Sequence, residues 1–257
     1  MLNWIRSLVF QVWFFGSVVL FASAAVLVGI FPGASFRVAR AWCRGMLLAG
    51  KVLCGLDYVI EGRDNIPDQP SVILIKHSSV WEAYAQVVIF PRQCWVLKRE
   101  LFSVPFFGWG LRTLKPIAID RGAGRTAVRQ VIDQGKSRLA EGIWVTVFPE
   151  GTRVAPGTTK KYGISGAALA HEAGVPVVPV AHNAGDYWPR RSLLKRPGLI
   201  RVCIGPPLDG AAQSPKETNA LVQSWIETKM TEISSGYQKQ GADDSSSAPA
   251  DDSKNPS

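Results

Sequence analysis

Short apolar segments alternate with stretches of helical periodicity along most of this chain, and this alternation limits the fold more than any other feature. The apolar segments after residue 56 are rich in β-branched residues and are bounded by Gly, Pro or charged residues, as buried strands are. Strands that alternate with helices usually pair in parallel, so we predict an α/β domain with a mostly parallel central sheet flanked by helices. The predicted strands are Tyr58–Ile60, Val72–Ile75, Cys94–Leu97, Pro116–Ile119, Ile143–Phe148, Val175–Ala181 and Ile200–Ile204, and the predicted helices are Trp81–Phe90, Ala123–Leu139, Gly163–Ala173 and Lys216–Ile233.

The first 56 residues have a different character. The segment Leu8–Phe31 is almost continuously apolar and, at about 1.5 Å per residue, is long enough to cross a bilayer. The next segment, Ser35–Leu56, carries three arginines on one helical face, opposite apolar residues. Basic residues therefore flank the first segment on both sides, which leaves a single span and a hairpin that dips into one leaflet both open. We predict an N-terminal two-helix membrane-associated segment over residues 1–56.

The charge and the cysteines narrow the classes of partner. The chain has a formal net charge of +9, which together with the apolar N-terminus suits a membrane surface or phosphate-bearing substrates. No recognisable nucleic-acid-binding motif accompanies this charge, so we predict no nucleic-acid partner. The four cysteines include no Cys-x-x-Cys pair, and no histidine stands beside them at metal-ligand spacing, so we predict no metal site.

The rest of the chain divides at residue 235. Residues 57–235 carry the strand and helix pattern, and we predict that they form one α/β domain. Residues 236–257 are rich in Ser, Asp, Ala, Gly and Pro and have almost no apolar content, which predicts a disordered tail. The chain contains no Gly-x-x-x-x-Gly-Lys-Ser/Thr loop of nucleotide hydrolases and no Gly-x-Ser-x-Gly elbow of α/β-hydrolases.

Polar residues follow three of the predicted strands at the point where each strand ends. His77 follows the second strand, Arg121 follows the fourth, and the turn Pro149–Arg153 follows the fifth. Ligands of open α/β sheets bind beyond the carboxyl ends of parallel strands. The sequence therefore predicts a site at this edge for an anionic substrate that bears a hydroxyl group.

His77 and Glu82 are the candidates for chemistry at this edge. A neutral imidazole held by a carboxylate can take a proton from an alcohol near pH 7. The two side chains meet if His77 lies on the turn after the strand and Glu82 lies in the first turn of the helix. With Ser79 as N-cap, however, Ser79 and Glu82 would form a capping box, so a purely structural role for Glu82 is open too.

The turn Phe148–Arg153 reads Phe-Pro-Glu-Gly-Thr-Arg. Gly151 permits close approach of a ligand to the backbone, and Arg153 can grip a phosphate with two parallel hydrogen bonds. Glu150 would repel a phosphate, so we expect it to orient Arg153 or a substrate hydroxyl. The alternative is a surface turn that binds nothing.

Four blocks across about residues 70–182 resemble the glycerolipid acyltransferases of the 1-acylglycerol-3-phosphate acyltransferase type. The segment His77–Glu82 is similar to the family's His-x4-Asp block, with Glu where Asp is usual. Lys115–Arg121 is similar to the second block, which usually opens with Gly. Phe148–Arg153 matches the third block in full, and Val175–Val180 resembles the proline-punctuated fourth.

The resemblance implies a one-step acyl transfer. His77, oriented by Glu82, would deprotonate the sn-2 hydroxyl of 1-acylglycerol 3-phosphate (lysophosphatidic acid) for attack on the thioester of acyl-CoA or acyl carrier protein. The product would be phosphatidic acid for phospholipid biosynthesis, and no cofactor beyond the thioester co-substrate is implied. The implied substrate-binding residues are Arg121, Glu150, Gly151, Thr152 and Arg153, with Lys98 as a possible addition because the stretch Lys98–Trp109 is also similar to one common in the family.

The resemblance also implies a place and partners. We expect the catalytic domain to face the cytoplasm at a bacterial inner membrane, in contact with membrane lipids. Two alternatives stay open. One is a related acyltransferase that acts on another lysophospholipid or an ornithine-type lysolipid. The other is a non-catalytic membrane adaptor.

Overall fold

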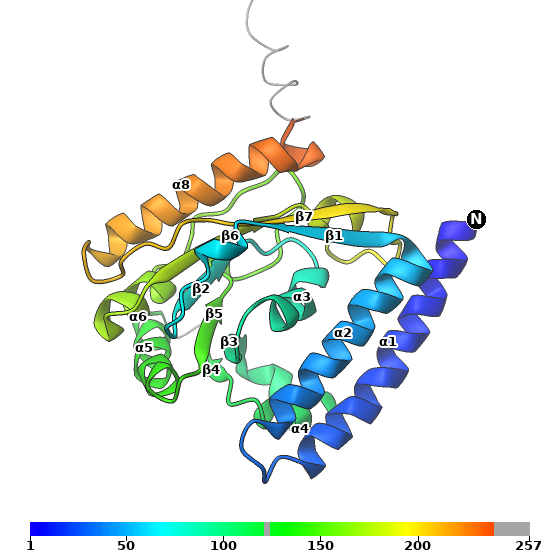
Figure 1. The fold of residues 1–257 in the computed structure, drawn as a ribbon, viewed down its shortest axis with the longest axis horizontal. Coiled ribbons are helices and arrows are strands. Elements are labelled where there is room, and N and C mark those ends of the chain that lie inside the picture. Colours follow the sequence, from blue (N-terminus) through cyan, green and yellow to red (C-terminus); the bar gives the residue numbers. More distant parts are fainter. Residues whose placement is uncertain (121–123, 239–257) are drawn as a thin grey trace, which may run out of the picture.

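The structure, a computed structural model, describes residues 1–120 and 124–238 and contains a single seven-stranded sheet within those ranges (Figure 1). The strands are β1 (Leu56–Glu61), β2 (Val72–Ile75), β3 (Gln93–Lys98), β4 (Ile117–Ile119), β5 (Trp144–Val147), β6 (Val177–His182) and β7 (Gly198–Ile204). The α-helices are α1 (Leu2–Leu27), α2 (Ala34–Cys54), α3 (Trp81–Ile89), α4 (Phe107–Arg112), α5 (Arg125–Ala140), α6 (Ser165–Ala173), α7 (Ala184–Tyr187) and α8 (Pro215–Ile233).

The sheet has the order β1-β7-β6-β2-β5-β3-β4. The five strands from β6 to β4 pair in parallel, while β7 is antiparallel to β6 and parallel to β1. The predicted mostly parallel α/β fold is thus confirmed. Because five neighbouring strands run in one direction, their carboxyl ends share one edge of the sheet, where the sequence places its polar residues.

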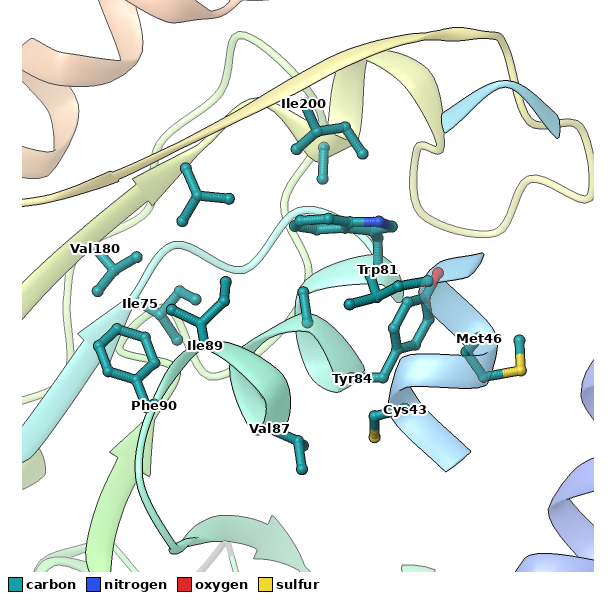
Figure 2. Close-up of a cluster of buried hydrophobic side chains, with 14 of the residues drawn as sticks. Cys43, Met46, Ile75, Trp81, Tyr84, Val87, Ile89, Phe90, Val180 and Ile200 are labelled. Carbon is teal, nitrogen blue, oxygen red and sulfur yellow. The ribbon is translucent and has the colours of Figure 1, made fainter. Parts of the chain in front are cut away.

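Helices cover both faces of the sheet, and each face has its own apolar core (Figure 1). Alternate residues of β2 point to opposite sides: Ile73 packs with α2 and α3, whereas Leu74 packs with α5, α6 and α8. Figure 2 shows the first of these cores, in which Trp81 and Tyr84 of α3 meet Met46 of α2. The core therefore fixes α3, which carries Glu82, between the sheet and the N-terminal helices.

Helices α1 and α2 form the expected antiparallel hairpin along one side of the domain (Figure 1). Helix α1 begins at Leu2 rather than Leu8, and among the described helices it is the one long and apolar enough to cross a membrane. One face of α1 packs on the domain, so that Phe10 is fully buried, while Trp13 and Leu20 on other faces are about half to two-thirds exposed at 48% and 68%.

A buried lysine ties α1 to the domain. The Nζ atom of Lys195 donates to Gln11 Oε1 at 2.9 Å and lies 4.9 Å from the ring centroid of Phe10. The ring of Trp188 lies on the same ammonium group at 4.5 Å. Burial lowers the pKa of Lys195 to about 8. The backbone oxygen of Trp188 in turn accepts from the Ser79 hydroxyl at 2.7 Å, so the α1 contact reaches the turn after β2.

The predicted disordered tail begins too early. Residues 235–238 form a helical turn in which the Tyr237 hydroxyl donates to Glu227 Oε2 at 2.5 Å and to the carbonyl of Thr158 at 2.9 Å. These bonds hold Tyr237 against the domain although the flanking composition is polar. The remainder of the expected tail, residues 239–257, lies outside the described residues, as does the first residue of the predicted helix Ala123–Leu139.

Candidate active site

His77 lies directly beyond the carboxyl end of β2, on the turn that leads into α3. Its Nδ1 lies 2.8 Å from Glu82 Oε1. A carboxylate accepts hydrogen bonds, so Nδ1 carries the ring proton and Nε2 keeps its lone pair. The side chain is 17% exposed, which leaves the ring edge accessible from outside. The geometry is that of a histidine base oriented by a carboxylate.

Glu82 is fully buried and is held by several donors. Its carboxylate accepts from the backbone N–H groups of Ser78 and Ser79 at 3.0 Å as well as from His77. Burial by itself raises the pKa of Glu82, but the nearby rings of His182 and His77 and the Ser79 amide bring the pKa below its usual value. Glu82 is therefore a carboxylate at neutral pH, as an orienting partner of an imidazole must be.

The predicted capping box is only half formed. The Glu82 carboxylate accepts from the Ser79 amide as expected, but the Ser79 hydroxyl accepts from the amide of Trp81 at 3.2 Å instead of that of Glu82. The N-cap residue of α3 is Val80, one residue later than predicted. The difference goes with two other bonds. The Glu82 carboxylate also bonds to His77, and the Ser79 hydroxyl donates to the carbonyl of Trp188.

The turn Phe148–Arg153, which follows β5, and the next residue contact His77 at three points. The Phe148 ring stacks on the imidazole with centroids 4.0 Å apart. The amide of Val154, which follows the turn, donates to the carbonyl of His77 at 2.8 Å. The amide of His77 reaches Glu150 Oε1 at 3.4 Å. The ring, the amide and the carbonyl of His77 are thus all contacted by one segment from a neighbouring strand.

The structure places the side chain of Glu150, an expected substrate-binding residue, away from the protein surface. The Glu150 side chain is fully buried beside Lys76, at 3.3 Å between Oε1 and Nζ, and so it faces the interior of the domain. Thr152 is exposed, Arg153 is half-buried, and Gly151 has the left-handed conformation at φ 69° that the turn requires. Arg121 lies outside the described residues.

Lys98 ends β3 at the same edge of the sheet and is exposed. Its ammonium group can therefore stay hydrated in the free protein and contact an anionic group of a ligand. At the opposite end of β4, Lys115 has a left-handed backbone with φ 54°. This conformation costs a non-glycine residue about 1–2 kcal/mol, which explains in physical terms why glycine is usual at this position of the second block.

His182 is not among the candidates from the sequence, yet it lies close to Glu82. It ends β6, is fully buried, and its Nε2 lies 3.9 Å from Glu82 Oε2. Nε2 donates to the carbonyl of Lys76 at 2.7 Å, and burial lowers the pKa of His182, so the ring is neutral. The rule that selected His77, a polar residue just past a buried strand, would have selected His182 too.

An apolar chamber of about 230 Å³ opens beside the same residues. Helices α1 to α4 and strand β3 form its walls, and Phe148, which stacks on His77, belongs to its lining. No side chain of the lining within the described ranges is charged. The lining includes Phe14, Trp42, Val87, Trp95 and Leu111. An apolar group bound in this chamber would therefore contact Phe148, the ring that stacks on the imidazole.

Comparison with known proteins agrees with this geometry. The family model described as "Acyltransferase" matches residues 57–183. The chain is 46% identical over 200 residues to a 1-acyl-sn-glycerol-3-phosphate acyltransferase of Pseudomonas aeruginosa, which covers 77% of this chain and 78% of that protein. The chain belongs to this acyltransferase family. The resemblance drawn from the four blocks is thereby confirmed, and the protein is an enzyme of the acyltransferase class.

More distant relatives extend the comparison. The acyltransferase is 28% identical over 181 residues to human 1-acyl-sn-glycerol-3-phosphate acyltransferase alpha, covering 69% of this chain and 64% of that protein. Its fold matches the crystal structure of the 1-acyl-sn-glycerophosphate (LPA) acyltransferase PlsC from Thermotoga maritima, with a TM-score of 0.74 and 21% identity over 97% of this chain and 98% of that one. The N-terminal hairpin is thus included in a known arrangement of this fold.

Proposed function

We propose that this acyltransferase moves an acyl group from a thioester to the sn-2 hydroxyl of 1-acylglycerol 3-phosphate and so makes phosphatidic acid. The observation that carries the proposal is the His77–Glu82 pair, at 2.8 Å, beside an apolar chamber. A base next to an apolar cavity suits a substrate that joins a hydroxyl group to an acyl chain. The activity named for the relatives in Pseudomonas aeruginosa and human supports the same acceptor.

The proposed step needs no covalent enzyme intermediate. Nε2 of His77 takes the hydroxyl proton while the hydroxyl oxygen attacks the thioester carbonyl carbon. The carbon–sulfur bond then breaks, and the imidazolium returns its proton to the leaving thiolate. Glu82 keeps the proton of His77 on Nδ1 and stabilises the imidazolium as it forms, which is the work of the carboxylate in other His-dependent acyl transfers. No metal ion or cofactor takes part, and the thioester of CoA or of acyl carrier protein is the co-substrate.

Arginine side chains supply the proposed phosphate contacts. Arg153 follows the turn that grips His77, so a phosphate bound there lies near the reacting hydroxyl. Arg121 and Lys98 follow the neighbouring strands β4 and β3. Gly151 and Thr152 offer the glycerol a close approach to the backbone and a hydroxyl group. Glu150 is left out of this set because its side chain is buried.

The proposed location is the surface of a membrane, with the hairpin lying in one leaflet. One face of α1 contacts the domain from Ser7, whose hydroxyl accepts from the amide of Lys195, to Ala22, which touches Gly110 of α4. A helix held along its length cannot stand across the bilayer unless the domain enters the bilayer with it. The exposed apolar faces of α1 therefore favour a hairpin that dips, with the domain on the cytoplasmic side of a bacterial inner membrane.

One assay tests acceptor and donor together. Purified enzyme in mixed vesicles is given lysophosphatidic acid, lysophosphatidylethanolamine or an ornithine-type lysolipid, each with acyl-CoA and with acyl carrier protein thioester. We expect acylation of lysophosphatidic acid to exceed that of the other acceptors. If another lysolipid is acylated and lysophosphatidic acid is not, the acceptor is wrong. If no acceptor reacts with either donor, the result favours the alternative of a non-catalytic membrane adaptor.

A further inference from the structure

A second buried charged group lies behind the candidate site. Lys76 directly precedes His77 and is 1% exposed. Successive residues of an extended chain point to opposite faces of the sheet, so Lys76 points toward α8 while His77 points toward α3. Its Nζ lies 2.7 Å from Glu227 Oε1 of α8 and 3.3 Å from Glu150 Oε1. A buried lysine thus joins the C-terminal helix to the turn that grips the imidazole.

The Glu227 end of this group is closed by two tyrosines. The Tyr162 hydroxyl donates to Oε1 of Glu227 at 2.8 Å, and the Tyr237 hydroxyl donates to Oε2 at 2.5 Å. Burial opposes ionisation of Glu227, but Lys76 and these hydroxyls hold its pKa below the usual value. The ion pair of Lys76 with Glu227 therefore persists inside the domain, where an unpaired ammonium group would be costly.

The Glu150 end reaches the catalytic residue. Burial raises the pKa of Glu150 despite the nearby Lys76, and its Oε2 has no hydrogen-bond partner among the described residues. Only Oε1 is engaged, by Nζ of Lys76 and by the amide of His77 at 3.4 Å. Glu150 Oε1 thus lies between the ammonium group of Lys76 and the backbone amide of His77. A displacement of that ammonium group would therefore shift Glu150 and, through it, His77.

We propose that Lys76 is a positioning residue for the acyl transfer, which acts on His77 through Glu150 and is itself fixed by Glu227 and Tyr237. The inference rests on the proposed function, because it concerns the orientation of the proposed base. It gives the acidic residue of the Phe-Pro-Glu-Gly turn a role inside the domain instead of a role in substrate binding. It also makes the last described turn of the chain part of the machinery that sets the rate.

The test separates positioning from stability. Lys76→Met leaves two buried carboxyl groups without their cation, so we expect both Tm and kcat to fall. The double variant Lys76→Met/Glu227→Gln removes the charge of one of these two carboxyl groups, so we expect Tm to recover in large part. A positioning role predicts that kcat of the double variant stays about 10- to 100-fold below wild type while KM for acceptor and donor is unchanged, because small misplacements of a base cost that much. Recovery of kcat together with Tm overturns the proposal.

Further variants complete the test. Glu61→Gln makes the same chemical change as Glu227→Gln in an ion pair at 2.7 Å with Arg201 on the β1 edge, and we expect wild-type kcat. Tyr237→Phe removes one hydroxyl that donates to Glu227 and is expected to lower kcat by about 2- to 5-fold, because Glu227 keeps its bonds to Lys76 and Tyr162. An unchanged kcat for Tyr237→Phe removes the C-terminal turn from the proposal. If the wild-type enzyme transfers no acyl group, the proposed function is wrong. If it does and the double variant has wild-type kcat, only the positioning role of Lys76 is wrong.

Discussion

The charged centre around His77 and the apolar chamber meet at Phe148, and they are built in opposite ways. In the charged centre, Glu82 accepts from His77 and from two backbone amides, and His182 backs it with a second ring. In the chamber, the walls are apolar side chains from five elements, and Val87 of α3 is one of them (Figure 2). Helix α3 serves both regions, with its first turn in the centre and its later turns along the chamber.

The difference predicts two kinds of sensitivity. Hydrogen bonds in the centre fix proton positions, so replacing a single atom changes the chemistry. The chamber contributes shape and apolar surface, so only a change of volume matters there, and it affects which guest fits. The comparison would be contradicted if a chamber variant abolished the rate, or if a variant of the charged centre altered only the selectivity.

The largest effect is expected for His77→Ala. Without a base, proton transfer falls back on water, and positioned general bases contribute about 10²- to 10⁴-fold. We therefore expect kcat to fall by at least about 100-fold, with folding and vesicle binding unchanged. Circular dichroism and vesicle flotation are the controls. Acyl transfer at the wild-type rate would rule out His77 as the base.

Glu82→Gln is expected to be nearly as damaging, by about 100-fold in kcat, because an amide in place of the carboxylate permits the wrong imidazole tautomer. The Gln amide can donate to Nδ1, which moves the ring proton to Nε2. Glu82→Asp keeps the acceptor and should retain much more activity than Glu82→Gln. Equal loss in the two variants would mean that packing, and not proton placement, is what Glu82 provides.

A substitution in the chamber should alter selectivity rather than rate. Val87→Phe places a larger side chain into the lining, and we expect a several-fold shift toward shorter acyl chains with kcat on the best donor nearly kept. Overpacking of this kind costs about 1–3 kcal/mol of stability. Val88→Phe is the matched control, because Val88 is the next residue of α3 and does not belong to the lining of the chamber. An equal shift in both variants would contradict the chamber as the acyl site.

The smallest effect concerns Lys195, which holds the α1 wall of the chamber. Its pKa of about 8 lies below the ordinary 10.5, so between these pH values the unfolded chain binds more protons than the folded one. Stability should therefore rise with pH from about 8 toward 10, by about 2–5 °C in Tm. Lys195→Met should lose this rise, and the difference between the two Tm profiles isolates Lys195 from other groups. Parallel profiles would show that Lys195 does not titrate in this range.

Local patterns in the sequence were enough to predict the sheet. Each predicted strand overlaps an observed one, because buried β-branched segments bounded by turns leave the chain few alternatives. Helices α4 and α7 were missed, since they have six and four residues and show no full period. Helix α3 begins at Trp81 as predicted, but its N-cap is Val80 instead of Ser79, and Glu82 bonds to His77 as well as to the start of its own helix.

The site divides in the same way. The meeting of His77 with Glu82 follows from their spacing and from the turn between them. The burial of Glu150 does not, because it depends on Lys76 and on Glu227, which lies 151 residues beyond Lys76 in the chain. The chamber could not be predicted either, since its walls come from helices and a strand whose packing no local pattern specifies.

The parallel pair of β1 and β7 at the edge of the sheet orders events in time. Strand β1 directly follows the hairpin, yet it pairs with β7, which ends at Ile204. At synthesis rates of about 5–20 residues per second, β1 waits on the order of 7–30 s for its partner. The apolar hairpin has left the ribosome throughout that interval. The N-terminus of the nascent chain is thus available to a lipid surface before the enzyme can close its sheet.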